Sequence, residues 1–145
     1  MGTLRRLHFD PDKETHGVER DFVVEDGKIP VLVGSTTNPD YQRERSKLIQ
    51  PYLQRIRQGE ATDEEIRLIV APAVAKFILL KFMGGKLDDG TDLSHFNTPE
   101  RKLEVLENPG FGEFYEWLLA TGSNPRNFGM DADDQRKAEQ DSAGN

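Results

Sequence analysis

Histidines and carboxylates near the N-terminus are the first residues whose types could do chemistry. His8, Asp10, Asp12 and His16 lie close together and could be drawn as a metal-binding cluster. Their spacing matches no known pattern of metal ligands, however. We therefore interpret them as solvated loop residues.

A second acidic group, Asp88, Asp89 and Asp92, follows the most apolar stretch of the chain. An EF-hand loop places its carboxylates at alternate positions ahead of a glycine and ends on a glutamate. Neither feature is present around Gly90. A turn at Asp89–Gly90 explains these residues without an ion, so we expect no metal site here.

Patterns for catalysis are absent as well. The sequence contains no glycine-rich phosphate loop, nucleophile elbow or HExxH motif. It has 0 cysteines, which excludes disulfides and thiolate chemistry, and none of its 3 histidines lies near a patterned nucleophile. The sequence thus indicates a protein that is not an enzyme, carries no cofactor and acts by binding.

Charge and composition limit the kinds of partner that the protein could bind. The formal net charge of -7 at pH 7 disfavours binding to nucleic acids or to anionic membranes, because both would repel the chain at long range. The first residues contain no apolar secretory segment. We therefore expect a soluble, intracellular protein, and 145 residues are enough for one domain.

The elements that would position a binding site are organised around residues 64–85, EEIRLIVAPAVAKFILLKFMGG. A helix that is apolar on most faces is usually central in the fold. Thr62 and Glu65 form a capping box, and Gly84–Gly85 supplies a stop, which predicts a helix over 62–83. Pro72 would kink or split it. A membrane span would require about 20 apolar residues without the lysines and proline found here, so the pattern favours a buried core helix.

Before this helix, the sequence predicts a β-hairpin over 21–33. Two β-branched or aromatic runs, 22–24 and 29–33, flank Asp26–Gly27, which is typical of a type I′ turn. Pro30 indicates an edge of the sheet, because proline donates no hydrogen bond. Residues 1–20 are expected to form an arm or an edge strand.

Periodic apolar residues and caps predict further helices over 39–58, 99–107 and 111–121, the first kinked at Pro51. Residues 129–145 lack aromatic and β-branched residues, which predicts a disordered or loosely helical acidic tail. The fold class is therefore α+β and mainly helical. The hairpin and about four helices would form a single globular domain, 21–128, around helix 62–83.

One side of the helix over 39–58 is basic, and its residues are Arg43, Arg45, Lys47, Arg55 and Arg57. This side is either a docking surface for an acidic partner or a nucleic acid, or a solvated surface. The lack of interleaved aromatic residues favours the solvated surface. A docking role would suit a small regulator directed at a host protein.

The order of features along 29–128 resembles the tail assembly chaperones of long-tailed bacteriophages and related prophage elements. A strand ending in Val31-Leu-Val33 leads to Asn38-Pro-Asp-Tyr41, a basic helix and an apolar helix. Asp89-Gly-Thr91 and Phe96-Asn-Thr98 follow, and then come a short leucine-rich helix, the aromatic residues Phe111, Phe114 and Trp117, and the closing Asn127-Phe128.

This resemblance implies a protein that binds the tape-measure protein, keeps it soluble and recruits tail-tube subunits. It would act in the cytoplasm of the host bacterium, possess no catalytic residues and be absent from the mature virion. Homo-oligomers are compatible with this role. A long apolar helical partner requires an apolar groove, and the residues that we predict to line it are Phe77, Leu80, Phe82, Met83, Phe114 and Trp117.

A structural protein of the virion is the alternative hypothesis. A tail-completion or head–tail connector subunit would use the hairpin 22–33 to extend sheets in a ring. Such a subunit would be found in purified particles, whereas a chaperone would not.

Overall fold

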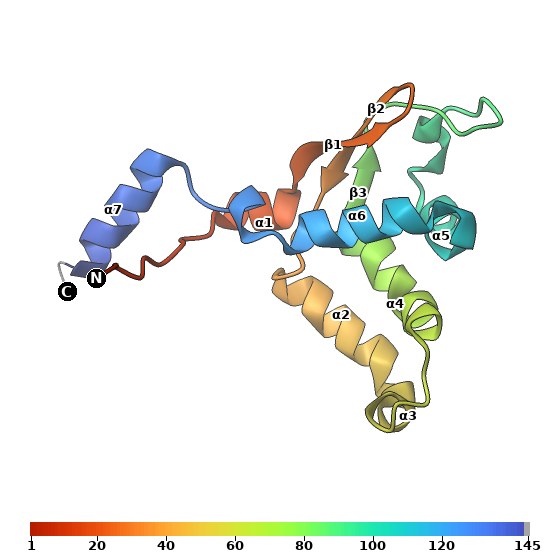
Figure 1. The fold of residues 1–145 in the computed structure, drawn as a ribbon, viewed down its shortest axis with the longest axis horizontal. Helices are drawn as coiled ribbons and strands as arrows, with labels where there is room; N and C mark the ends of the chain where they lie inside the picture. The colour runs from red at the N-terminus through yellow and green to blue at the C-terminus, as the bar shows by residue number, and fades with distance from the viewer. Residues whose placement is uncertain (144–145) are drawn as a thin grey trace.

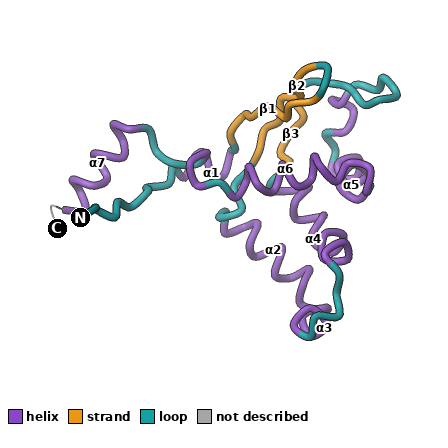
Figure 2. The backbone as a smooth tube through the Cα atoms, viewed as in Figure 1, coloured by secondary structure: helices purple, strands orange, loops and turns teal. Residues whose placement is uncertain are grey.

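Helices α4 (Asp63–Phe77) and α6 (Gly112–Ser123) contact the β-sheet, whereas α7 (Ala132–Ala143) lies far from it (Figure 1). The computed structural model describes residues 1–143. Within them, a three-stranded antiparallel sheet in the order β1-β2-β3 is combined with helices (Figure 2). This confirms the predicted fold class, α+β and mainly helical, with a hairpin near the N-terminus.

The regular elements follow one another with short connections. The α-helices and strands are α1 (Pro11–His16), β1 (Val18–Val24), β2 (Gly27–Val33), α2 (Pro39–Ile49), α3 (Leu53–Arg57), α4 (Asp63–Phe77), β3 (Leu79–Phe82), α5 (Pro99–Glu107), α6 (Gly112–Ser123) and α7 (Ala132–Ala143). Single-turn 3-10 helices lie between them: η1 (Gln50–Tyr52), η2 (Leu93–Phe96), η3 (Pro109–Phe111) and η4 (Pro125–Asn127).

The predicted helix over 62–83 is correct only in its first part. Thr62 caps α4 as expected, with its hydroxyl accepting a hydrogen bond from the Glu65 amide at 3.1 Å. The helix continues through Pro72 without splitting but ends at Phe77. Residues 79–82 form a strand instead, pairing with β2 so that Phe82 lies opposite Val31. A short apolar run suits a buried helix or a buried strand equally well. Here residues 79–82 form a strand, because they pair with the free edge of β2.

Strand β3 would leave an unpaired edge, and a side chain closes it. The amide of Asn97 lies beside Phe82, whose backbone N–H donates to Oδ1 at 2.7 Å. The Asn97 Nδ2 group donates to the Phe82 carbonyl at 3.0 Å. The side chain thereby takes the place that a neighbouring strand would occupy.

The predicted helix over 39–58 is interrupted at Pro51. Its first part, α2, begins at Asn38, whose side chain accepts from the Asp40 amide. The single turn η1 contains Pro51 and is followed by α3. A proline removes the backbone donor that a continuous helix needs, which explains the break.

Of the two structures predicted for the tail 129–145, disordered or loosely helical, residues 132–143 form a helix, α7, and residues 144–145 lie outside the described part. The expected arm, 1–20, contains α1 and the start of β1. Its residues hold the C-terminal segment in place. Phe9 bridges Gly129, and His8 and Gln135 exchange hydrogen bonds of 2.9 and 2.8 Å. Local sequence patterns do not reveal partners so far apart in the chain.

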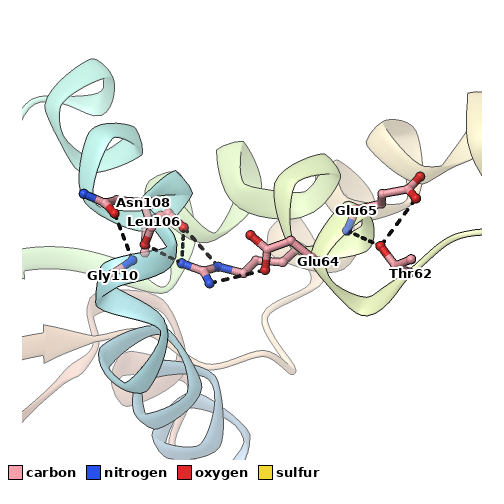
Figure 3. Close-up of polar contacts among 7 residues, drawn as sticks. Thr62, Glu64, Glu65, Leu106, Asn108 and Gly110 are labelled. Atoms are coloured by element: carbon pink, nitrogen blue, oxygen red, sulfur yellow. Dashed lines mark hydrogen bonds and ion pairs between the residues drawn. The ribbon is translucent and has the colours of Figure 1, made fainter.

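Helices α4 and α5 each provide a cation for the other's C-terminal end. The Lys102 ammonium group of α5 donates to the carbonyl oxygens of Ala75 at 3.3 Å and Leu80 at 2.9 Å. Arg67 of α4 donates in return to Leu106, at 2.8 Å from Nη2, and to Asn108 at 3.0 Å (Figure 3). The last carbonyls of a helix lack partners within the helix and carry partial negative charge, so buried cations stabilise them.

We predict that Lys102→Met destabilises the fold. Lys102 is 7% exposed, and burial lowers the pKa of its ammonium group. Removing the donor leaves the carbonyls of Ala75 and Leu80 unpaired, which should lower the free energy of unfolding by about 1–3 kcal/mol. Urea denaturation followed by circular dichroism measures this. Lys47→Met on the exposed side of α2 is the control and should change the value by less than about 0.5 kcal/mol.

A second prediction concerns alkaline pH. Burial raises the pKa of Tyr115 to about 12, partly offset by the Arg67 guanidinium, which lies 4.6 Å from the ring centre. An unfolded tyrosine ionises near pH 10. Between these values the folded chain holds a proton that the unfolded chain has lost, so Tyr115 makes stability fall as the pH rises from about 10 to 12.

Melting temperatures measured at intervals from pH 9 to 11.5 test this. Tyr115→Phe should flatten the alkaline loss of stability, although burial also raises the pKa of Tyr41 and some slope should remain. Tyr52→Phe is the matched control, because the Tyr52 side chain is exposed. Equal slopes for wild type and Tyr115→Phe would contradict the assignment.

Candidate partner-binding site

A pocket of about 220 Å³ opens between the β-hairpin, the loop that follows β3, and the start of α6. Its wall is mostly apolar. The lining residues are Phe22, Val24, Ile29, Phe82, Lys86, Leu87, Asp88, Leu93, Val105, Phe111 and Phe114. This pocket is our candidate site for a partner.

Aromatic rings form one wall of the pocket and continue behind it. Phe114 lies at the centre, with ring centroids 5.5 Å from Phe82, 5.4 Å from Phe22 and 5.9 Å from Trp117. Phe22 also meets Trp117 at 5.3 Å. These separations are within the range of favourable aromatic pairs. The cluster joins β1, β3 and α6.

The structure brings three of the predicted groove residues together, namely Phe82, Phe114 and Trp117. Phe82 and Phe114 line the pocket, and both are largely buried, at 2% and 7% exposed. Trp117 contacts the Phe114 ring but does not line the pocket.

The other three predicted residues lie elsewhere. Phe77 ends α4, with the Lys76 ammonium group 5.2 Å from its ring centre. Leu80 lies beside Gly17 and Gly34. Met83 follows Phe82 and is 45% exposed. Strand alternation directs it to the opposite side of the sheet from Phe82. Because β3 is not helical, these residues do not share one face as the predicted helix would have required.

Several lining residues were not predicted, among them Phe22, Ile29 and Leu87. The first two face each other across the hairpin, and the alternation of β1 and β2 would have placed them on one side of the sheet. Leu87 lies in a polar loop, where no periodic pattern marks it.

In the acidic loop beside the pocket, the carboxylates of Asp89 and Asp92 accept hydrogen bonds that form local turns. Asp89 accepts a hydrogen bond from the Thr91 amide and Asp92 accepts one from Ser94, both at 2.9 Å. These hydrogen bonds, with Thr91 and Ser94 respectively, hold the pKa of both carboxyl groups below the usual value. Across residues 1–143, no group of three or more histidines and carboxylates is placed to hold a metal ion.

Three of the basic side chains of α2 and α3 have partners within the chain. Arg43 pairs with Asp40 at 3.2 Å, and Arg55 pairs with Glu65 of α4 at 3.0 Å. Arg45 contacts Tyr41, which is buried. In the described residues, no helix is long and apolar enough to cross a membrane.

A comparison with family models matches residues 36–145 to the family described as YdaY prophage protein. The match begins just before α2 and continues through α7, so it covers most of the chain. No curated protein and no solved structure matches the chain. On the strength of the family match, the chain is a phage or prophage protein and belongs to the YdaY prophage protein family.

Proposed function

We propose that this prophage protein is a non-catalytic tail assembly chaperone whose pocket receives apolar side chains of the tape-measure protein. The observation that carries the proposal is the apolar pocket beside the Phe22–Phe82–Phe114 cluster. Membership of a prophage family and the resemblance of 29–128 to tail assembly chaperones support it.

The size of the pocket favours a protein segment over a free small molecule. Sites for small molecules usually have volumes of about 300–1,000 Å³, and this pocket has about 220 Å³. A pocket of that size suits one or two large side chains projecting from a helix or an extended segment. The tape-measure protein is long, helical and apolar, and it offers many such side chains.

In this role the chain acts in the cytoplasm of the host bacterium and leaves before the virion matures. It covers apolar segments of the tape-measure protein and presents that protein to tail-tube subunits. The net charge of -7 keeps the chaperone soluble while it carries an apolar partner.

We predict that Leu87→Asp strongly weakens capture of the tape-measure protein encoded by the same prophage. Leu87 is a half-buried wall residue in a loop, so a carboxylate there should place an unpaired charge against the partner without unfolding the chain. Co-expression followed by a pull-down should show at least about a tenfold loss of bound partner, equivalent to about 1.4 kcal/mol.

Leu68→Asp is the matched control, because Leu68 is 43% exposed on α4 and does not line the pocket. Phe82 and Phe114 are unsuitable for the test, since truncating a buried phenylalanine costs about 3–5 kcal/mol of stability. Equal capture by wild type and Leu87→Asp, with both folded, would exclude the pocket as the binding site.

A structural subunit of the virion is the second candidate, and the edge of β1 favours it. Strand β1 pairs only with β2 in the described sheet, so its other edge could accept a strand from a neighbour. Mass spectrometry of purified particles distinguishes the two functions. A chaperone is absent from mature particles, whereas a connector or tail-completion subunit is present in each one.

A further inference from the structure

The side of the sheet that faces away from the helices is uncovered. Inward residues such as Val31, Val33 and Phe82 are 0–2% exposed, and helices α4 and α6 pack on that side. On the outward side, Val23 is 71% and Met83 is 45% exposed. The residues that alternation places outward are Glu19, Asp21, Val23, Lys28, Pro30, Leu32, Lys81 and Met83. We call this set the outer face.

Across the outer face, acidic residues lie on one edge strand and a lysine lies on the other. Glu19 lies opposite Leu32, and Leu32 lies opposite Lys81, so one row runs from a carboxylate through an apolar residue to an ammonium group. The next row contains Asp21 and Pro30, and the Met83 amide donates to the Pro30 carbonyl at 2.8 Å. The acidic residues are therefore all on β1, Lys81 is on β3, and Lys28 lies on β2 opposite Val23.

These charges have no ion-pair partner within residues 1–143. Elsewhere, exposed arginines pair with nearby carboxylates, as Arg43 does with Asp40 and Arg101 does with Glu104. The outer face thus combines exposed apolar side chains with charges of opposite sign at opposite edges. A surface of this kind suits a partner in which the same charges occur in reverse order.

We propose that a second copy of the chain covers the outer face, packed sheet on sheet about a two-fold axis that runs along the strands. Such an axis places β1 of one copy over β3 of the other. Each row of residues across one sheet then lies over the same row of the partner's sheet. Glu19 of each copy then faces Lys81 of its partner, and Asp21 faces Met83. Leu32 and Pro30 of β2 form the centre, with Lys28 near its own copy at the hairpin end of that strand. Two packed sheets normally keep their strands within about 30° of each other, and interfaces with two-fold symmetry are self-complementary.

This dimer leaves the candidate pocket free, because Phe22, Ile29 and Phe82 lie on the inward side. It is therefore independent of the proposed chaperone function. Leu87→Asp, which tests the pocket, should not change the dimer, and variants of the outer face should leave the pocket itself intact.

Sedimentation equilibrium of the full chain tests the dimer. Wild type should be dimeric at micromolar concentration, and both Glu19→Lys and Lys81→Glu should weaken dimerisation by at least about tenfold, because two-fold symmetry repeats each like-charge contact. Mixing the two variants should restore a heterodimer. The introduced lysine of one variant then faces the introduced glutamate of the other, and the native pair of Glu19 with Lys81 remains. The double variant in one chain should dimerise as well.

Glu116→Lys on α6 and Lys47→Glu on α2 are controls with the same changes of charge at exposed positions outside the outer face. They should dimerise like wild type. A monomeric wild type at about 100 μM would overturn the proposal, as would single variants that dimerise normally. Failure of the mixture and of the double variant to regain dimers would also overturn it.

Discussion

The buried ammonium group of Lys102 is the interaction on which the rest of the structure depends. It joins the end of α4 to the start of β3, because its two acceptors lie on either side of Phe77–Leu79. The chain can therefore leave a helix and enter a strand within a single turn. That change of direction brings Phe82 beneath Phe114. The ammonium group thus stabilises the turn through which the most apolar segment passes from helix to strand.

Arg67 performs the corresponding task at the other end of the same helix pair. Its hydrogen bonds to Leu106 and Asn108 hold the turn from which η3 and α6 begin. Glu64 balances its charge at 3.5 Å, and the ring of Tyr115 lies against the guanidinium group. Lys102 and Arg67, one from each helix, hence hold the two connections beside the aromatic cluster, from α4 to β3 and from α5 to η3. A long, planar and permanently charged side chain suits the acceptors of a helix end better than an apolar one.

Local patterns predicted the helix starts, because a cap needs only neighbouring residues. Asn38, Thr62 and Thr98 all accept the expected backbone hydrogen bonds. Local patterns did not predict the end of α4. They placed it at the Gly84–Gly85 stop signal, whereas the helix ends earlier, at Phe77. Phe82 was thus placed in the site for the wrong reason, on a helix, and Leu87 was missed. Lys102, Asn97 and the N-terminal partners of α7 act over long separations that no local period encodes.

Asn97 has a consequence for how sheets of this protein can join. Assembly into fibrils requires two open edges per molecule, so that each new strand creates a template for the next. The side-chain amide closes the β3 edge at Phe82, and only the β1 edge of the described sheet stays open. Strand addition at one molecule therefore ends after a single partner. The amide makes such growth self-terminating, which benefits a protein with exposed apolar side chains.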